Sequence, residues 1–209
     1  MANEFSSSWE QDIHQAIDIL RSGGLVAYPT DTVYGLGAHA FQERAVEKVY
    51  KVKQRPRNMA LPLLLADSAD MAKVASRIPD LAWRLAERFF PGALTLVLWK
   101  SPAVPSIVTG GGDTVAVRVP NHPIPIALIK GLCAPIIGTS ANLSGQPSPL
   151  TAQEVRRQLG GKVDLIIDGG RCPGAIESTV LNLTGDVPRI VREGAIPRSV
   201  IEGVAHVSR

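Results

Sequence analysis

The sequence predicts an α/β fold in which a mixed β-sheet is flanked by helices. Apolar runs of strand length alternate with amphipathic segments of helical spacing, and the strands cluster towards the end of the chain. The 209 residues are 45% hydrophobic and 20% charged, so they supply enough apolar surface for one substantial core. No internal repeat, low-complexity tract or change of composition marks a second domain.

Helices are expected where apolar residues recur at helical spacing and where capping residues begin the run. Ser8 with Gln11, and Thr151 with Glu154, resemble capping boxes. The expected helices run from residue 8 to the glycines at 23 and 24, over 43–53, 68–76, 79–89 and 123–130, and from 151 to the glycines at 160 and 161. The expected strands cover 25–28, 62–66, 94–99, 115–119, 135–138, 165–167, 179–183 and 189–191. Residues 30–37 are expected to form a glycine-bearing loop.

Three features of the sequence indicate a cytoplasmic protein. The first ten residues are polar and lack the basic start and apolar run of a secretory signal. Apolar runs such as 61–66 are far shorter than the ~20 residues that span a bilayer. Cys133 and Cys172 stand far apart without CxxC spacing, so we expect free thiols in a reducing compartment and no zinc site.

Basic residues are concentrated in one short segment, although the formal net charge is only +3. Within ten positions lie Lys48, Lys51, Lys53, Arg55 and Arg57. Such a cluster suits a polyanionic small ligand or an RNA backbone. A solvated helix face explains it equally well.

Several common enzyme signatures are absent or fit poorly. Gly35-x-Gly37-x-x-Ala40 resembles a dinucleotide fingerprint, but six residues separate Tyr28, at the end of the preceding strand, from the first glycine. A Rossmann fold needs that glycine almost directly after the strand. The chain has no GxxxxGK[ST] loop and no GxSxG elbow, and its four histidines are scattered. A P-loop site and triad hydrolysis are therefore disfavoured.

Two segments carry more specific chemistry. Lys53, Arg55 and Arg57 alternate at a helix exit, and in extended chain they would share one side, where a phosphate would balance their charge. Residues 138–145, GTSANLSG, follow an apolar strand with small hydroxyl and amide side chains. Such residues suit the ligand crevice at the carboxyl end of strands in open α/β sheets. An exposed basic turn and an ordinary polar turn remain the simple alternatives.

Together the two segments form a Lys-x-Arg pair at Lys53 and Arg55 and a Ser-x-Asn pair at Ser140 and Asn142. With these pairs the chain resembles the threonylcarbamoyl-AMP synthase (YrdC/TsaC) family from about residue 9 to residue 197. Further matching blocks, in chain order, are residues 28–37, 90–95, 115–120, 176–180 and 191–196. Several ordered blocks are far more specific than any one motif.

The resemblance implies a YrdC-like twisted mixed sheet flanked by helices, with a concave basic cavity that holds ATP and L-threonine side by side. It implies one domain over residues 9–197, with flanking tails at 1–8 and 198–209, as in the short, single-domain form of the family. By carry-over, the threonine contacts would be Thr32, Arg118, Gly138 and Ser178. The ATP contacts would be Lys53, Arg55, Met59, Thr114, Ser140, Asn142, Ser148 and Arg192. Met59 and Leu64 stand where many members of the family carry asparagine and histidine, respectively.

The implied activity joins L-threonine, bicarbonate or CO2 and ATP, with Mg2+, into threonylcarbamoyl-AMP and pyrophosphate. The four residues expected to carry catalysis are Lys53, Arg55, Ser140 and Asn142. By the same resemblance, the product passes to a transferase that modifies the tRNA adenosine next to the anticodon.

Two other functions remain open. The basic concavity could bind RNA without catalysis, although the sequence lacks an RRM or dsRNA-binding signature and only 5% of its residues are aromatic. The chain could also be a paralogue with another acceptor or without synthase activity.

Overall fold

The computed structural model describes residues 7–174 and 176–208. Its helices are α1 (Ser7–Arg21), α2 (Glu43–Lys53), α3 (Met71–Val74), α4 (Asp80–Phe89), α5 (Pro123–Leu132), α6 (Ala152–Leu159) and α7 (Arg198–Glu202), with 3-10 turns η1 (Ser68–Asp70) and η2 (Gly160–Lys162). The first strands are β1 (Val26–Tyr28), β2 (Gly35–Gly37), β3 (Leu63–Leu64), β4 (Ala75–Arg77), β5 (Leu94–Lys100) and β6 (Thr114–Arg118). The remaining strands are β7 (Ile136–Ile137), β8 (Thr139–Ser140), β9 (Leu165–Ile166), β10 (Thr179–Asn182) and β11 (Arg189–Arg192).

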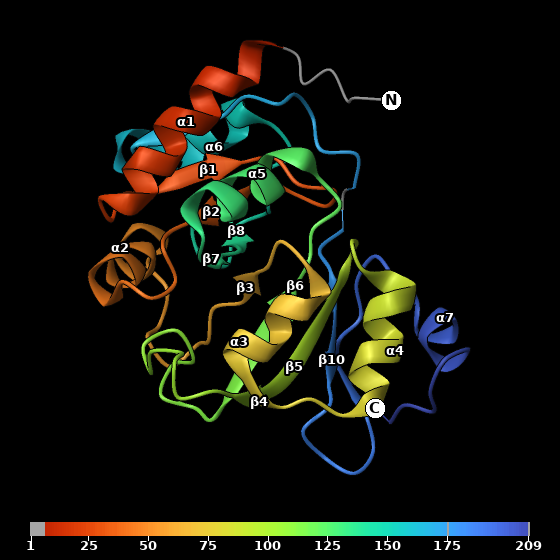
Figure 1. Cartoon of the computed structure of the whole chain (residues 1–209). Coiled ribbons are helices and arrows are strands. Elements are labelled where there is room, and N and C mark those ends of the chain that lie inside the picture. Colours follow the sequence, from red (N-terminus) through yellow and green to blue (C-terminus); the bar gives the residue numbers. More distant parts are fainter. Residues whose placement is uncertain (1–6, 175, 209) are drawn as a thin grey trace.

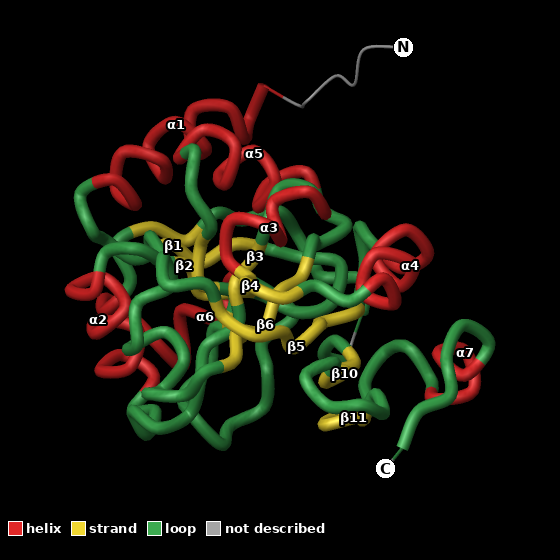
Figure 2. Tube along the Cα trace, turned by 60° about the horizontal axis from the view of Figure 1, so that its bottom comes forward, coloured by secondary structure: helices red, strands yellow, loops and turns green. Residues whose placement is uncertain are grey.

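The strands form two mixed sheets instead of one. The smaller sheet has the order β8-β2-β1-β9, and the larger has the order β11-β10-β5-β6-β3-β7, with β4 paired to the far end of β5. Each sheet contains both parallel and antiparallel neighbours, which confirms the predicted mixed α/β class. β1–β6 lie in the middle of the molecule with helices on several sides, whereas β10 and β11 lie towards its periphery (Figure 2).

Each sheet has its own helices (Figure 1). α1 and α5 lie against one another over the smaller sheet, and their apolar faces share a buried cluster that includes Ile17, Val26 and Leu128. α3 and α4 cover the larger sheet, where Met71 and Leu85 belong to the main core.

The chain crosses between the sheets at Gly138. Ile137 pairs with Leu63 of the larger sheet, whereas Thr139 pairs with Leu36 of the smaller one. A Cβ atom at Gly138 would lie 2.4 Å from Cγ of Leu64, so only glycine fits between the two pairings. The segment with the predicted Ser-x-Asn pair therefore begins at the junction of the sheets.

The prediction of a glycine-bearing loop over 30–37 is wrong for its last three residues, because Gly35–Gly37 form β2 and pair with β1. A Cβ atom at Gly35 would lie 2.8 Å from the Tyr28 ring, and one at Gly37 would lie 2.6 Å from it. The Tyr28 ring is fully buried, and its hydroxyl donates to the carbonyl oxygen of Ile137 at 3.0 Å. The two glycines thus make room for a core tyrosine, which explains the false dinucleotide pattern.

Two predicted helix boundaries also differ. The helix expected over 68–76 ends at Val74, because the next three residues pair with β5 as β4, and strand pairing overrides the local helical pattern. α1 covers Ser7, the first described residue, so Ser8 already lies within the helix. The second predicted cap is confirmed, since the Thr151 side chain accepts from the Glu154 backbone N–H.

The expected domain boundary at residue 197 does not coincide with the end of packed structure. α7 lies beyond it, and Ile201 and Val207 are both fully buried in the main core. The Ser208 N–H donates to the Pro188 carbonyl at 2.8 Å. The segment expected as a tail, as far as residue 208, is thus part of the domain, whereas residues 1–6 of the expected N-terminal tail lie outside the described residues.

Candidate functional site

A cavity of about 640 Å³ lies between the two sheets. Its walls come from β8 of the smaller sheet and from β3, β5, β6, β10 and β11 of the larger sheet. The predicted site residues that line it are Thr32, Lys53, Arg55, Met59, Arg118, Gly138, Ser140, Asn142, Ser148, Ser178 and Arg192. The fold therefore collects nearly all of them from distant stretches of chain into one space.

Thr114 is the predicted site residue that the cavity does not include. It begins β6 and pairs with Trp99, whereas Ala116 and Arg118 on the same strand reach the cavity. Because side chains alternate along a strand, Thr114 shares their face but lies one further step away. The structure thus gives Thr114 no contact with the cavity.

Lys53 is buried beneath the Ser-x-Asn segment and is only 1% exposed. Its ammonium donates to the Ser140 carbonyl, to the Asn142 carbonyl at 2.7 Å and to Asn142 Oδ1 at 3.2 Å. The Ser140 hydroxyl also donates to Asn142 Oδ1, at 2.6 Å. An ammonium group has three N–H donors, and all three are used here. Lys53 therefore holds the backbone and the Asn142 side chain of the Ser-x-Asn segment in place.

Burial lowers the pKa of Lys53 to about 7, and the positive charge of Arg55 acts in the same direction, partly opposed by Glu177. In the unfolded chain the amine has its ordinary pKa of 10.5, so it binds a proton that the folded protein releases between about pH 7 and 10. The unfolded state then binds more protons, and the contribution of Lys53 to the free energy of unfolding rises with pH in this window.

We expect Lys53→Met to remove this rise. Urea unfolding at a series of pH values from about 7 to 10 should show the wild type gaining stability relative to the variant as the pH increases. Both proteins share all other titrating groups, so the difference between the curves isolates Lys53. Parallel curves would contradict the low pKa.

Arg55 reaches the cavity because of how α2 ends. Gln54 adopts a left-handed conformation (φ 52°), and the Arg55 N–H donates back to the Tyr50 carbonyl at 3.0 Å. The guanidinium is held by the carbonyl oxygens of Met59 at 3.2 Å and Ala60 at 2.9 Å. Its Nη1 group donates to no other described residue. Arg55 thus presents a fixed cation with spare donors to the cavity.

The expected alignment of three cations on one side of an extended chain is wrong. Both Lys53 and Arg55 line the cavity, but the left-handed turn at Gln54 separates them: Lys53 is buried under Ser140 and Asn142, whereas Arg55 presents its guanidinium to the cavity. Arg57 is absent from the cavity lining and forms an exposed ion pair with Glu47 of α2. The chain therefore sends each of the three cations to a different environment.

Arg118 is held on the opposite wall by three acceptors. It donates to the Gly92 carbonyl at 2.8 Å, to the Thr32 hydroxyl at 3.0 Å and to Asp31 Oδ1 at 2.6 Å. Its side chain is 9% exposed and that of Asp31 is 15% exposed. Asp31 also accepts from the Asn121 N–H at 3.1 Å. These contacts fix the plane of the guanidinium, as two-point binding of a carboxylate requires.

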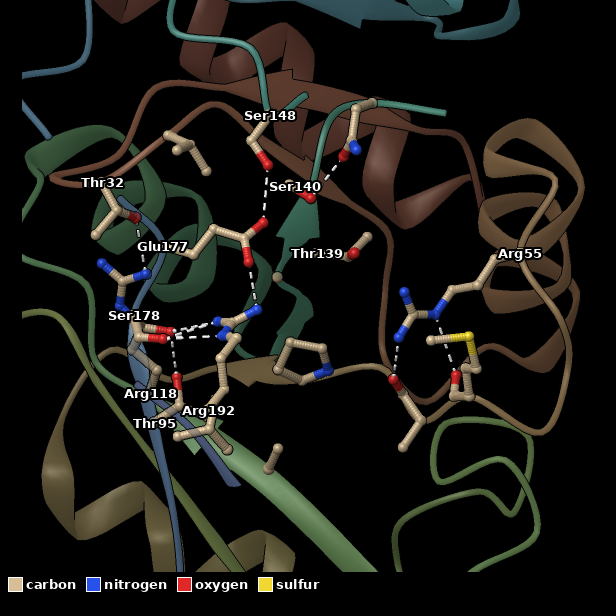
Figure 3. Close-up of a pocket in the computed structure, with 18 of the residues that line it drawn as sticks. Thr32, Arg55, Thr95, Arg118, Thr139, Ser140, Ser148, Glu177, Ser178 and Arg192 are labelled. Atoms are coloured by element: carbon tan, nitrogen blue, oxygen red, sulfur yellow. Dashed lines mark hydrogen bonds and ion pairs between the residues drawn. The ribbon is translucent and has the colours of Figure 1, made fainter. Parts of the chain in front are cut away.

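Arg192, Glu177 and Ser148 form a connected group beside Arg118 (Figure 3). Arg192 donates to the Ser178 carbonyl through Nε at 3.2 Å and Nη2 at 2.8 Å, and its Nη1 pairs with Glu177. The other oxygen of Glu177 accepts from the Ser148 hydroxyl at 2.7 Å. Ser178 Oγ and Thr95 Oγ1 are 2.8 Å apart and are both buried.

Sequence reasoning assigned no role to several cavity residues, among them Glu177, Thr95, Thr139 and Gln146. Glu177 and Thr95 lie inside two blocks that matched the family, so their position in those blocks was the available signal. The cavity also contains Met59 and Leu64, the two departures from the family pattern. Met59 is 47% exposed at the cavity surface, whereas Leu64 is buried against Gly138.

Gly194 supports the Glu177–Ser178 wall through the backbone. A Cβ atom at this position would lie 2.3 Å from the Glu177 carbonyl oxygen and 2.6 Å from that of Ser178. We therefore expect Gly194→Ala to lower the free energy of unfolding by about 2 kcal/mol, because backbone must move. At Gly161 no heavy atom lies within 4 Å of the Cβ position, so Gly161→Ala should change stability by less than about 0.5 kcal/mol. Urea unfolding measures both, and equal losses would contradict this account.

Among the residues that the structure describes, no three His, Cys, Asp or Glu side chains gather where they could hold a metal ion. Within residues 7–174 and 176–208, no helix is long and apolar enough to traverse a bilayer.

The fold and the cavity define a class of protein: an α/β fold with a cavity lined by basic side chains between two mixed sheets. Residues 18–194 match the model of the Sua5/YciO/YrdC family, which carries the description "Telomere recombination". The chain belongs to this family.

Curated relatives agree with this assignment. The chain is 47% identical over 195 residues to a threonylcarbamoyl-AMP synthase of Pyrococcus abyssi, covering 93% of this chain and 57% of the relative. It is 43% identical over 205 residues to the enzyme of the same name from Bacillus subtilis, covering 98% and 59%. The chain thus spans somewhat less than three-fifths of the length of these two relatives.

Solved structures confirm the predicted fold. P. abyssi Sua5, in a crystal structure complexed with L-threonine, has a TM-score of 0.92 and 45% identity, covering 95% of this chain and 59% of that one. Escherichia coli YciO has a TM-score of 0.83 and 33% identity, covering 91% and 93%.

Proposed function

We propose that this protein is a threonylcarbamoyl-AMP synthase, which makes threonylcarbamoyl-AMP and pyrophosphate from L-threonine, bicarbonate or CO2, and ATP. The observation that carries the proposal is the gathering of Arg55, Arg118 and Arg192 around one cavity, at the positions that the family resemblance gave to the two substrates. The names of the P. abyssi and B. subtilis relatives and the threonine complex of P. abyssi Sua5 support it.

The threonine side of the cavity is the wall made by Thr32, Arg118 and Ser178. Arg118 offers a positioned guanidinium for the amino-acid carboxylate. The Thr32 and Ser178 hydroxyls can pair with polar groups of the substrate. A site that hydrogen-bonds the threonine hydroxyl rejects valine, because its polar groups would be left unpaired.

On the nucleotide side, Arg55 lies across the cavity from Ser148 and Arg192 (Figure 3). There Arg55 would bind the polyphosphate. Lys53 would act through Ser140 and Asn142 as a positioning residue, because its own donors are occupied. Preorganised donors of this kind stabilise charge that develops in the transition state.

The reaction needs no protein nucleophile. The threonine amine combines with bicarbonate to give a carbamate and water, and a carbamate oxygen then attacks the α-phosphorus, which releases pyrophosphate. The main demands are positioning of two anionic reactants and stabilisation of charge on the phosphates. A cavity lined by four basic side chains and one carboxylate, among its described residues, meets both demands.

The donors in the cavity fit Mg2+ that arrives with the nucleotide. In nucleotide sites Mg2+ is held largely by substrate phosphate oxygens and water, and here the Ser140 hydroxyl oxygen, which lines the cavity, would add a ligand. When bound, the ion would neutralise phosphate charge.

The decisive test is product formation. Purified protein is incubated with ATP, Mg2+, 13C-bicarbonate and L-threonine, and mass spectrometry searches for threonylcarbamoyl-AMP that carries one 13C. We expect labelled product and an equal amount of pyrophosphate. Salt-sensitive RNA binding with no pyrophosphate release would favour the RNA-binding alternative, and product only with another amino acid would identify a paralogue.

We further propose that the product serves tRNA modification in the cytoplasm, through a transferase that acts on the adenosine next to the anticodon. Cys133 and Cys172 are both free thiols, which suits a reducing compartment. Pull-down of the transferase activity, or transfer of label from threonine to tRNA in a reconstituted mixture, tests this step.

A further inference from the structure

Glu177 is the one carboxylate among the described residues that line the cavity. The cavity otherwise presents four basic side chains, which suits an anionic ligand. A carboxylate in such a place repels the ligand unless it has a specific use. Its use can be read from its contacts.

Both oxygens of Glu177 are held by residues predicted to bind ATP. Ser148 donates its hydroxyl to Oε1 at 2.7 Å, and Arg192 pairs with Oε2 (Figure 3). Carboxylate and phosphate oxygens accept hydrogen bonds from the same donors. A phosphate that reaches Ser148 and Arg192 must therefore take the place of the Glu177 carboxylate.

The geometry allows this exchange. The side chain of Glu177 is 36% exposed, so the carboxylate can turn into water without carrying a buried charge. Arg192 stays in position when Glu177 leaves, because Nε and Nη2 both donate to the Ser178 carbonyl. Only Nη1 of Arg192 and the Ser148 hydroxyl change partner.

We propose that Glu177 is an internal counterion that occupies a phosphate subsite formed by Ser148 and Arg192, and that a phosphate group of the nucleotide displaces it. The proposal rests on the proposed function, because it takes the cavity to be a nucleotide site. Displacing Glu177 costs free energy, which lowers the net affinity of any anion for the subsite. A polyphosphate that also reaches Arg55 on the facing wall therefore competes better than a small anion does.

The test is calorimetric titration of pyrophosphate, and separately of ATP, into the wild type and Glu177→Gln, with EDTA present. Glutamine keeps the shape of the side chain and removes its charge. We expect the Kd of Glu177→Gln to be roughly tenfold lower for both ligands, the scale for removing one like charge at close range. The control is Glu47→Gln, which removes the same charge from the exposed pair with Arg57 outside the cavity and should leave both affinities unchanged.

Other outcomes overturn the proposal. An unchanged Kd would show that Glu177 does not compete with phosphate. Weaker binding of both ligands would make Glu177 a support for the site. If the wild type binds ATP but Glu177→Gln does not bind it more tightly, this proposal fails and the proposed function stands. If neither protein binds ATP, both proposals fail. Melting temperatures of the three proteins check that each is folded.

Discussion

Arg55→Ala should lower the turnover of ATP to pyrophosphate about 10²- to 10³-fold, or about 3–4 kcal/mol of transition-state stabilisation. Arg55 is the cation that the structure presents from the α2 side of the cavity, with its guanidinium fixed by the Met59 and Ala60 carbonyl oxygens. Removing a preorganised cation takes away charge stabilisation that alanine cannot replace. Pyrophosphate release in the presence of threonine, bicarbonate and Mg2+ measures the loss.

Arg57→Ala is the matched control for this variant. Arg57 lies two residues further along and carries the same charge, but it pairs with Glu47 outside the cavity. Loss of such an exposed pair costs at most about 1 kcal/mol of stability. We expect nearly normal turnover. If both variants lose activity equally, or if Arg55→Ala retains wild-type turnover, Arg55 does not bind the polyphosphate.

Arg118→Ala should raise the Kd for L-threonine at least about 100-fold, which corresponds to about 3 kcal/mol. The residue is nearly buried, and Gly92, Thr32 and Asp31 hold its plane in place. It is the only predicted threonine contact with a positive charge, so its loss leaves the amino-acid carboxylate without a counterion. Isothermal calorimetry with threonine alone measures the effect.

The same substitution leaves the Asp31 carboxylate without its cation. It should therefore also lower the free energy of unfolding, because removing one partner of a buried ion pair leaves an uncompensated charge. The double variant Arg118→Ala/Asp31→Asn removes that charge as well. It should regain stability in thermal unfolding but still fail to bind threonine. Threonine affinity close to that of the wild type in the folded double variant would remove Arg118 from the amino-acid site.

The sequence predicts the elements of this fold well where periodicity and capping agree. α2 has its predicted bounds of 43–53, and the Thr151 cap begins α6 as expected. It misses features decided by distant contacts. β4 exists because residues 75–77 meet the end of β5, and β2 exists because Gly35 and Gly37 fit against the Tyr28 ring. The division into two sheets likewise depends on the crossing at Gly138, which no local pattern encodes.

The site shows the same limit. Motif spacing and family resemblance identify Lys53, Arg55, Ser140 and Asn142 as neighbours, and the structure brings all four to one cavity. Spacing does not reveal that the Lys53 ammonium donates its hydrogen bonds to the protein itself. Nor does it reveal the turn that separates Lys53 from Arg55, because the residue in the αL conformation is Gln54 and not the glycine that usually marks such a turn. The role of Glu177 also becomes visible only when Ser148, 29 residues away, is seen at its carboxylate.

The central claim is that one cavity holds the nucleotide and the amino acid together. A crystal structure of the protein with L-threonine and a non-hydrolysable ATP analogue tests it most directly. We predict both molecules between the two sheets, with the threonine carboxylate on Arg118 and the phosphates on Arg55 and Arg192. Electron density for either molecule on another surface, or mutually exclusive binding at saturating concentrations of both, would contradict the claim.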